Sequence, residues 1–154
     1  MKYLIPLCIF SLTLFSGCAS EKVTIAPEDC IPISLEAFIG SYFFNSYSKV
    51  TMISPTRVLY EEALGPGREK KSLELEVAPE AWREFREAIE KAHVFSWEGK
   101  YIDDKICDGT QWSFRVKYKD KELDIYGSNK IPNKTQFKKF LDAISALAHK
   151  KPFQ

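Results

Sequence analysis

The sequence predicts an α+β fold with a mainly antiparallel sheet, in the order three strands, a helix, two strands and a helix, with both helices packed on one face. Residues 71–78 and 110–118 alternate apolar and polar side chains, as half-buried strands do. Residues 79–94 and 133–147 repeat apolar side chains at helical spacing. The turns between neighbouring strands are too short for the crossovers that a parallel sheet requires.

The first three strands lie in the N-terminal half. Residues 35–53 mix aromatics with Ser, Asn and Gly, which predicts one long or bulged strand. Residues 57–64 form a weaker strand candidate, and Gly65-Pro66-Gly67 is a strong turn signal. We therefore expect residues 57–64 and 71–78 to pair as a hairpin. One face of the last strand carries Leu73, Leu75 and Val77.

The first helix begins at Pro79, because proline suits the first helical turn, and Glu80 lies near the positive end of the helix dipole. Its apolar stripe is Trp82, Phe85, Ile89 and Ala92. The charged residues are expected to face water: Arg83, Glu84, Arg86, Glu87, Glu90 and Lys91.

The second half repeats the order of hairpin and helix. A loop at 96–109 leads into the strand 110–118, and Asp120-Lys121 turns the chain into a strand at 122–126. Asn133, with Gln136 three residues later, resembles a capping box at the start of the last helix. The apolar stripe of this helix is Phe137, Phe140, Leu141, Ile144 and Leu147.

Composition excludes several classes of protein. A chain of 154 residues with 45% hydrophobic residues is long and apolar enough to fold as one domain, and it is not intrinsically disordered. Lys and Arg number 22 against 21 Asp and Glu, so the formal net charge is only +1. No affinity for nucleic acid follows from this balance.

The N-terminus has the pattern of an export signal. Lys2 precedes an apolar run of residues 3–15, which is too short to span a bilayer, and small residues follow. The end of the run, Phe15-Ser16-Gly17-Cys18, resembles the lipobox of bacterial lipoproteins. We therefore divide the chain into a lipoprotein signal peptide at 1–17, a lipidated N-terminus and tether at 18–34, and a single α+β domain at 35–150.

The lipoprotein resemblance implies a location. In that family the cysteine, here Cys18, receives a diacylglyceryl group, the peptide is cut before it, and fatty acyl chains such as palmitate hold the protein on the membrane. Two or more chains anchor stably, whereas one holds only reversibly. Ala19 and Ser20 place no Asp beside the cysteine. By resemblance to Gram-negative lipoproteins, this favours the periplasmic side of the outer membrane, if the host is Gram-negative.

The mature chain keeps two cysteines, Cys30 and Cys107, and an even pair in an exported protein predicts a disulfide. Closing so long a loop contributes about 4–5 kcal/mol in the chain-entropy model. The alternative is a hydrolase in which His93 activates Cys107 and Asp104 or Asp108 orients the imidazole. No signature of a thiol hydrolase surrounds Cys107, so we expect no enzyme and no catalytic residues.

No cofactor or metal site is expected. The segment 104–109 superficially resembles a calcium loop, but Ile106 and Arg115 occupy positions 3 and 12, where carboxylate or other oxygen ligands are required. Two distant histidines without a C-x-x-C motif give no zinc pattern. Asp108-Gly109 is adequately explained as a turn.

A second resemblance has its motifs in residues 97–132 and, with the helix before them, covers about the last two-thirds of the chain. Asp108-Gly109 followed by Trp112, then Tyr126-Gly127-Ser128-Asn129 and Pro132, resembles small bacterial domains, often lipoproteins, and implies a fold rather than an activity. In the sharp turn after the strand, Gly127 suits unusual dihedral angles and Asn129 a left-handed position. The possible binding surface comprises Trp97, Asp103, Asp104, Asp108, Ser128 and Asn129.

Two functions remain open. The favoured one is a lipid-anchored, non-catalytic binding module of the bacterial cell envelope, whose partner is an envelope protein or another envelope component. Its surface would use aromatic side chains in excess of core needs, among them some of Tyr42, Phe43, Phe44 and Tyr47. The alternative is a periplasmic inhibitor or immunity lipoprotein against a toxin, lysozyme or hydrolase, which inserts the acidic segment 98–108 into an enzyme cleft.

Overall fold

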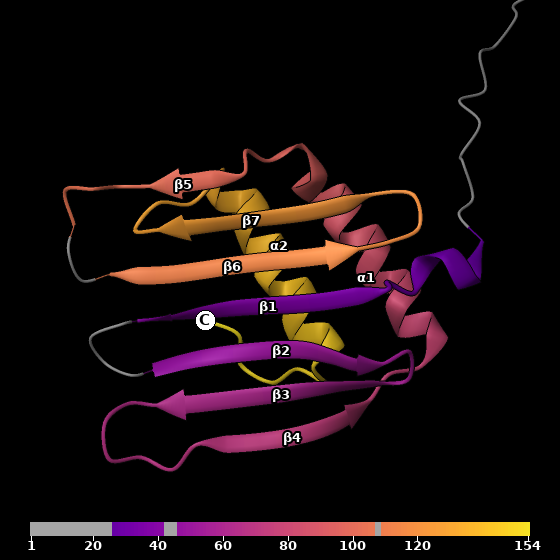
Figure 1. The fold of residues 1–154 in the computed structure, drawn as a ribbon, viewed down its shortest axis with the longest axis horizontal. Coiled ribbons are helices and arrows are strands. Elements are labelled where there is room, and N and C mark those ends of the chain that lie inside the picture. The colour runs from indigo at the N-terminus through magenta and orange to yellow at the C-terminus, as the bar shows by residue number, and fades with distance from the viewer. Residues whose placement is uncertain (1–25, 42–45, 107–108) are drawn as a thin grey trace, which may run out of the picture.

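A computed structural model describes residues 26–41, 46–106 and 109–154. Seven strands form one sheet in the order β4-β3-β2-β1-β6-β7-β5 (Figure 1). Neighbouring strands are antiparallel except β5 and β7, which are parallel, so the α+β fold has a mostly antiparallel mixed sheet. The strands are β1 (Ser34–Ser41), β2 (Ser46–Ser54), β3 (Arg57–Leu64), β4 (Lys71–Glu76), β5 (Lys100–Ile102), β6 (Thr110–Lys117) and β7 (Glu122–Ser128).

The predicted strand at 35–53 is wrong as a single element. It divides into β1 and β2, which pair antiparallel with Gly40 opposite Tyr47. The sequence also gives no sign of β5, because its three residues are too few to show an alternating pattern and it is held by pairing with β7. The predicted hairpins are confirmed as β3–β4 and β6–β7.

Both helices lie on the same face of the sheet (Figure 1). Helix α1 (Pro79–Lys91) begins at the predicted proline, and α2 (Lys134–Leu147) follows Asn133. The Asn133 side chain accepts hydrogen bonds from the backbone N–H groups of Thr135 and Gln136, at 3.0 and 3.2 Å, which confirms the predicted N-cap. In the part of the chain that is described, neither helix has the length and apolar character needed to cross a membrane.

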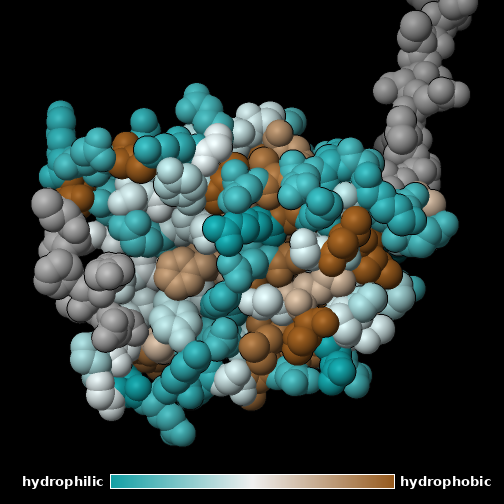
Figure 2. Space-filling model, viewed as in Figure 1, coloured by the Kyte–Doolittle hydropathy of each residue, from teal (hydrophilic) through white to brown (hydrophobic). Residues whose placement is uncertain are grey.

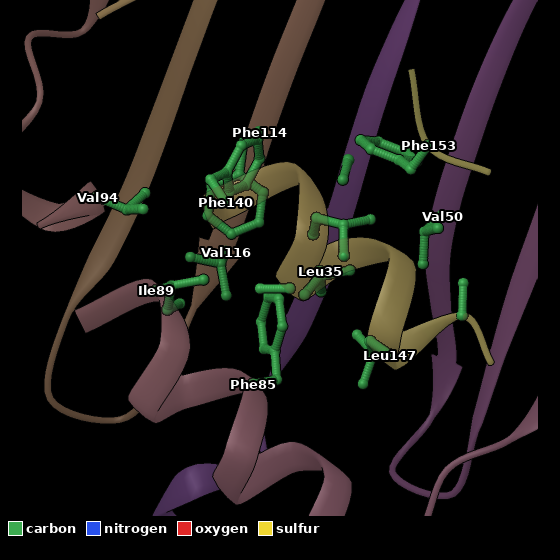
Figure 3. Packing of buried hydrophobic residues seen from close by; sticks show 14 of the residues in the cluster. Leu35, Val50, Phe85, Ile89, Val94, Phe114, Val116, Phe140, Leu147 and Phe153 are labelled. Carbon is green, nitrogen blue, oxygen red and sulfur yellow. The ribbon is translucent and has the colours of Figure 1, made fainter. Parts of the chain in front are cut away.

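The hydrophobic core lies between the sheet and the helices (Figure 3). Phe114 of β6 packs against Phe140 of α2 with ring centroids 4.9 Å apart, and against Phe85 of α1 at 6.5 Å. Burial of each such side chain contributes about 1.5–3 kcal/mol. The remaining side chains labelled in the figure are Leu35, Val50, Ile89, Val94, Val116, Leu147 and Phe153.

The folded unit extends beyond the predicted limits of 35 and 150. Before β1, a 3-10 helix η1 (Pro27–Cys30) places Cys30 in a buried position. After α2, Phe153 is 5% exposed, and the backbone carbonyl of Pro152 accepts a hydrogen bond of 2.8 Å from the Tyr60 hydroxyl on β3. Segments on both sides of the predicted domain therefore contribute to its core.

The helices do not cover the sheet as far as β4. Leu73, Leu75 and Val77 share a face as predicted, but their burial is graded along the chain. Leu73 is 41% exposed, Leu75 is half-buried and only Val77 is buried. The alternation correctly indicates a strand, whereas the extent of burial depends on where the helices end.

Candidate functional site

Trp97 belongs to the core and not to a surface patch, which corrects the sequence prediction. It is 9% exposed, and its ring lies 5.6 Å from that of Phe140 and 6.2 Å from that of Trp112. Within the described ranges, its indole Nε1–H has no hydrogen-bond partner. The 3-10 helix η2 (Val94–Ser96) turns the chain after α1 and directs Trp97 inward.

Three of the predicted residues do come together where β7 ends. The backbone N–H of Asp103 donates to the carbonyl of Ser128 at 2.9 Å, and Asn129 forms a bridge with Ile102. Gln111 joins them, because its Nε2 donates to the Ser128 hydroxyl at 2.9 Å. We call Asp103, Gln111, Ser128 and Asn129 the β7 corner. Asp104 is exposed beside it, and Asp108 lies outside the described residues.

The β7 corner is held mainly by structural contacts. Asn129 adopts the predicted left-handed conformation, with φ of 58°, and its Nδ2 donates to the carbonyl of Ile106 at 2.7 Å. A Cβ atom on Gly109 would lie 1.8 Å from the Asn129 Oδ1, so glycine there leaves room for the Asn129 side chain. Gly127 is needed for a different reason from the predicted one, because its Cβ would meet the Trp112 indole at 2.1 Å.

Lysines partly neutralise the negative charge of the segment 98–108. Lys100 and Lys105 alternate with the described acids Glu98, Asp103 and Asp104. The Asp103 carboxylate accepts a hydrogen bond from the backbone N–H of Lys105 at 3.1 Å. Within the described ranges, no three His, Cys, Asp or Glu side chains gather where they would hold a metal ion.

The predicted disulfide cannot be followed to its second cysteine, because Cys107 lies outside the described residues. Cys30 is buried and has no cysteine partner among the described residues, and burial raises the pKa of its thiol. The Ile106 carbonyl accepts a hydrogen bond from Asn129, which lies beside Thr110 at the start of β6. Shortly after Cys30, the backbone N–H of Ile33 donates to the carbonyl of Lys117 at the other end of β6. The described residues therefore do not support the bridge, which stays a prediction.

Arg86 corrects the expectation that the charged residues of α1 face water, since its side chain is 1% exposed. Its guanidinium lies 3.9 Å from the centroid of the Tyr118 ring and donates to Asp120 at 2.8 Å and Glu90 at 3.0 Å. Lys121 also pairs with Glu90, at 2.8 Å. These contacts join α1 to the β6–β7 turn.

The ion pairs change the titration of the carboxyl groups. The hydrogen bond from Arg86 lowers the pKa of Asp120. Burial acts to raise the pKa of Glu90, but the hydrogen bonds from Lys121 and Arg86 outweigh it and lower that pKa. Burial also raises the pKa of the Tyr118 hydroxyl, which has no hydrogen-bond partner in the described part of the chain. The arrangement is typical of a structural ion-pair network.

His93, the other member of the proposed Cys-His pair, ends the first helix. Its backbone is left-handed, with φ of 55°, and its N–H bonds the carbonyl of Glu90 at 2.9 Å. The backbone carbonyl of His93 also accepts a hydrogen bond of 2.7 Å from the Ser96 hydroxyl. A residue in the left-handed conformation commonly follows the end of a helix, so this structural role explains the position of His93.

The sheet face opposite the helices has no secondary structure packed on it in the described ranges, and Figure 2 shows it as a mixture of hydrophilic and hydrophobic surface. We call this the uncovered face. On β1, β2, β6 and β7, strand alternation places three aromatic side chains there: Phe38, Tyr47 and Tyr126. Tyr126 is 45% exposed, and the other two are half-buried.

Phe38 and Tyr47 form one platform on the uncovered face. Their rings stack with centroids 5.9 Å apart and planes inclined by 29°. Gly40 lies opposite Tyr47 in the register, and a Cβ there would approach the Tyr47 Cβ to 2.6 Å. Glycine at this position therefore leaves room for the tyrosine. Tyr47 is one of the candidate surface aromatics, whereas Tyr42, Phe43 and Phe44 lie outside the described residues.

The charged side chains on the same four strands are all paired within the protein. Glu36 pairs with Lys49 at 2.9 Å and with Arg115 at 3.6 Å. Arg115 also pairs with Asp124 at 3.2 Å, and Lys117 pairs with Glu122 at 2.9 Å. Three acidic and three basic groups thus cancel on this part of the uncovered face.

The sequence does not reveal this site as a unit. Each alternating strand indicates which residues share a face, but the strand order that brings Phe38 beside Ser113 and Tyr126 depends on the long-range pairing of β1 with β6. The available signal was the aromatic excess, of which Tyr47 was part. In comparisons with known proteins, no family model matched the chain and no curated protein matched it.

Proposed function

We propose that this protein is a lipid-anchored binding module of the bacterial cell envelope, with no catalytic role, that contacts an envelope component through the uncovered face of its sheet. The anchor is the lipidated Cys18 of the segment that resembles a lipobox. In a Gram-negative host the proposed location is the periplasmic side of the outer membrane.

The observation that carries the proposal is the contrast between the two faces of one sheet. The helices and the hydrophobic core occupy one face, while the other keeps Phe38 and Tyr126 accessible to a partner. Aromatic side chains are enriched at binding hot spots because they bury a large area at a small cost in conformational entropy.

The alternative, an inhibitor or immunity lipoprotein, depends on the acidic segment 98–108. Its described part alternates acids with Lys100 and Lys105, and Asp103 is engaged by the chain itself. These contacts do not favour insertion into an enzyme cleft. We therefore keep the uncovered face as the proposed contact surface.

The anchor and the surface are tested separately in cells that produce the full chain. Labelling with palmitate is expected to mark the wild-type protein and to be lost in Cys18→Ser. Chemical cross-linking in intact envelopes is expected to capture the same adduct with wild type and with the control Leu73→Ala, whose side chain is similarly exposed but on the other face. Loss of that adduct in Phe38→Ala/Tyr126→Ala supports the surface, and its persistence refutes it.

A further inference from the structure

We propose that the uncovered face binds an extended, uncharged polysaccharide strand. The inference rests on the proposed function, because it names the class of envelope component that this same surface contacts. The juxtaposition that carries it is two accessible aromatic side chains, Phe38 and Tyr126, on either side of Ser113 on a surface whose charges cancel.

The charge pattern does not favour a strongly charged ligand. A face that attracts nucleic acid or anionic lipid presents unpaired Lys and Arg side chains. Here Lys49 and Arg115 are held by Glu36, and Arg115 is also held by Asp124. A charged ligand would have to displace these pairs while being repelled by one partner of each. A ligand without charge meets no such cost.

The aromatic spacing fits a polymer with a regular repeat. The register places Phe38 beside Ser113, and Ser113 beside Tyr126, on three adjacent strands. Two steps of strand spacing separate the aromatic positions by about 10 Å. This separation is comparable to the length of the disaccharide unit in an extended β-linked glycan. Alternate sugar rings would then lie on Phe38 and Tyr126, with the intervening ring over the small Ser113.

The side chains around the rings have the chemistry that sugars require. The faces of aromatic rings are electron-rich, and they attract the slightly positive C–H groups on the faces of pyranose rings. Ser113 supplies a hydroxyl on the same face, and Gln111 and Ser128, which bond to each other at 2.9 Å, add further amide and hydroxyl groups on β6 and β7. Such groups exchange hydrogen bonds with sugar hydroxyls without adding charge. Tyr47, stacked on Phe38, extends the platform toward β2.

A second surface, between the two helices, carries no comparable signal of a ligand. A groove of about 450 Å³ lies between α1 and α2, and its floor includes Phe85, Ala88, Ala143 and Leu147. Nothing in the described part of the chain indicates what would fill it. The uncovered face instead combines cancelled charge, ring spacing and hydroxyl groups, and all three point to the same class of ligand.

The test uses the mature chain from residue 18 onward with Cys18→Ser, so that it is soluble but otherwise complete. Amide chemical shifts are followed while a tetramer of N-acetylglucosamine, and separately a tetramer of glucose, is added. We expect one of these probes to shift the amides of β1, β6 and β7 around Phe38, Ser113 and Tyr126. The affinity should be unchanged between low salt and about 0.5 M salt, because no ion pair forms with the ligand.

Variants assign the effect to the two rings. Tyr126→Ala should weaken binding about three- to tenfold and Phe38→Ala/Tyr126→Ala more than tenfold, in line with the value of stacked aromatic contacts. Leu73→Ala should bind as the wild type does. Because Phe38 is half-buried, the thermal midpoint of each variant is measured alongside. Tyr126→Ala, which removes an exposed ring, keeps the test valid should the double variant fold poorly.

The outcomes separate the inference from the proposed function. Absence of shifts on the uncovered face with both tetramers refutes the polysaccharide. So does binding that weakens steeply with salt. If the envelope adduct is then still lost in Phe38→Ala/Tyr126→Ala, the binding module stands with a protein partner. If neither the tetramers nor the envelope distinguish the variants, both proposals fall.

Discussion

Replacing Gly127 with alanine should destabilise the protein strongly, because β7 approaches the Trp112 indole too closely for any side chain. A Cβ at position 127 would lie 2.1 Å from the Trp112 Nε1 and 2.7 Å from the backbone oxygen of Lys130. The same indole N–H donates to that oxygen at 2.9 Å, and Trp112 is 2% exposed. The added methyl group therefore displaces a buried ring and breaks its hydrogen bond.

The expected loss has two parts. Forcing an additional group into a packed core costs about 1–3 kcal/mol. Leaving the buried indole N–H without an acceptor costs about 1–3 kcal/mol more. Gly127→Ala should therefore lower the free energy of unfolding by about 2–6 kcal/mol, which corresponds to a fall of about 1 M or more in the urea midpoint.

Urea unfolding followed by tryptophan fluorescence measures this loss, since Trp82, Trp97 and Trp112 are all buried. Gly99→Ala is the matched control. Its new Cβ would have as its nearest atom the Asp124 carbonyl oxygen at 3.9 Å, an ordinary contact, so the change should be neutral or stabilising by up to about 1 kcal/mol. A Gly127→Ala protein within about 0.5 kcal/mol of wild type would refute the close approach of β7 to Trp112.

Three further predictions concern the β7 corner, the Arg86 network and the buried thiol. Asn129→Gly keeps the left-handed backbone and should lower the free energy of unfolding by about 0.5–1.5 kcal/mol, because the side-chain hydrogen bond is lost. Asn129→Ala should lower it by about 1 kcal/mol more, because alanine is strained in that conformation. The reverse order in urea unfolding would contradict this account. The lowered pKa values of Glu90 and Asp120 contribute stability above the ordinary carboxyl pKa of about 4, and that stability is lost as the pH falls through the lower folded values. The thermal midpoint of Arg86→Met should therefore depend less on pH below about 5 than that of the wild type, and parallel curves would count against the network. Cys30 should react slowly with a thiol reagent in the native protein and rapidly after unfolding without reductant; failure to react after unfolding would instead establish a disulfide.

The sequence was most informative where structure is decided locally. The turn at residues 65–67, Pro79 at the start of α1 and Asn133 before α2 act within a few residues, and each lies where it was predicted. The sequence does not separate β1 from β2, because aromatics throughout 35–53 favour extended chain equally on both sides of the reversal.

Features that depend on distant partners were not predictable in the same way. Arg86 has the charge of a surface residue, but Tyr118 and Asp120 from the β6–β7 hairpin accommodate it in the interior. Trp97 was assigned to the surface because its position in a loop says nothing of the rings of Phe140 and Trp112. At the candidate site, Ser128 and Asn129 were identified from turn chemistry, whereas the uncovered face required the strand order.

That strand order also favours one sequence of folding events. β1 is the central strand of the sheet. Its partner β2 follows it directly in the sequence, whereas its other partner, β6, ends only at Lys117, opposite Ser34. The four N-terminal strands can form a local meander early, while the contact that completes the sheet closes over a long stretch of chain and is slow. Until then β1 is an open edge that bears Leu35, Ala37 and Ile39, with backbone groups free to pair with another chain. The exported chain proposed above would therefore be most vulnerable to aggregation after β4 has emerged and before β6 arrives, and protection by a chaperone would matter most in that interval.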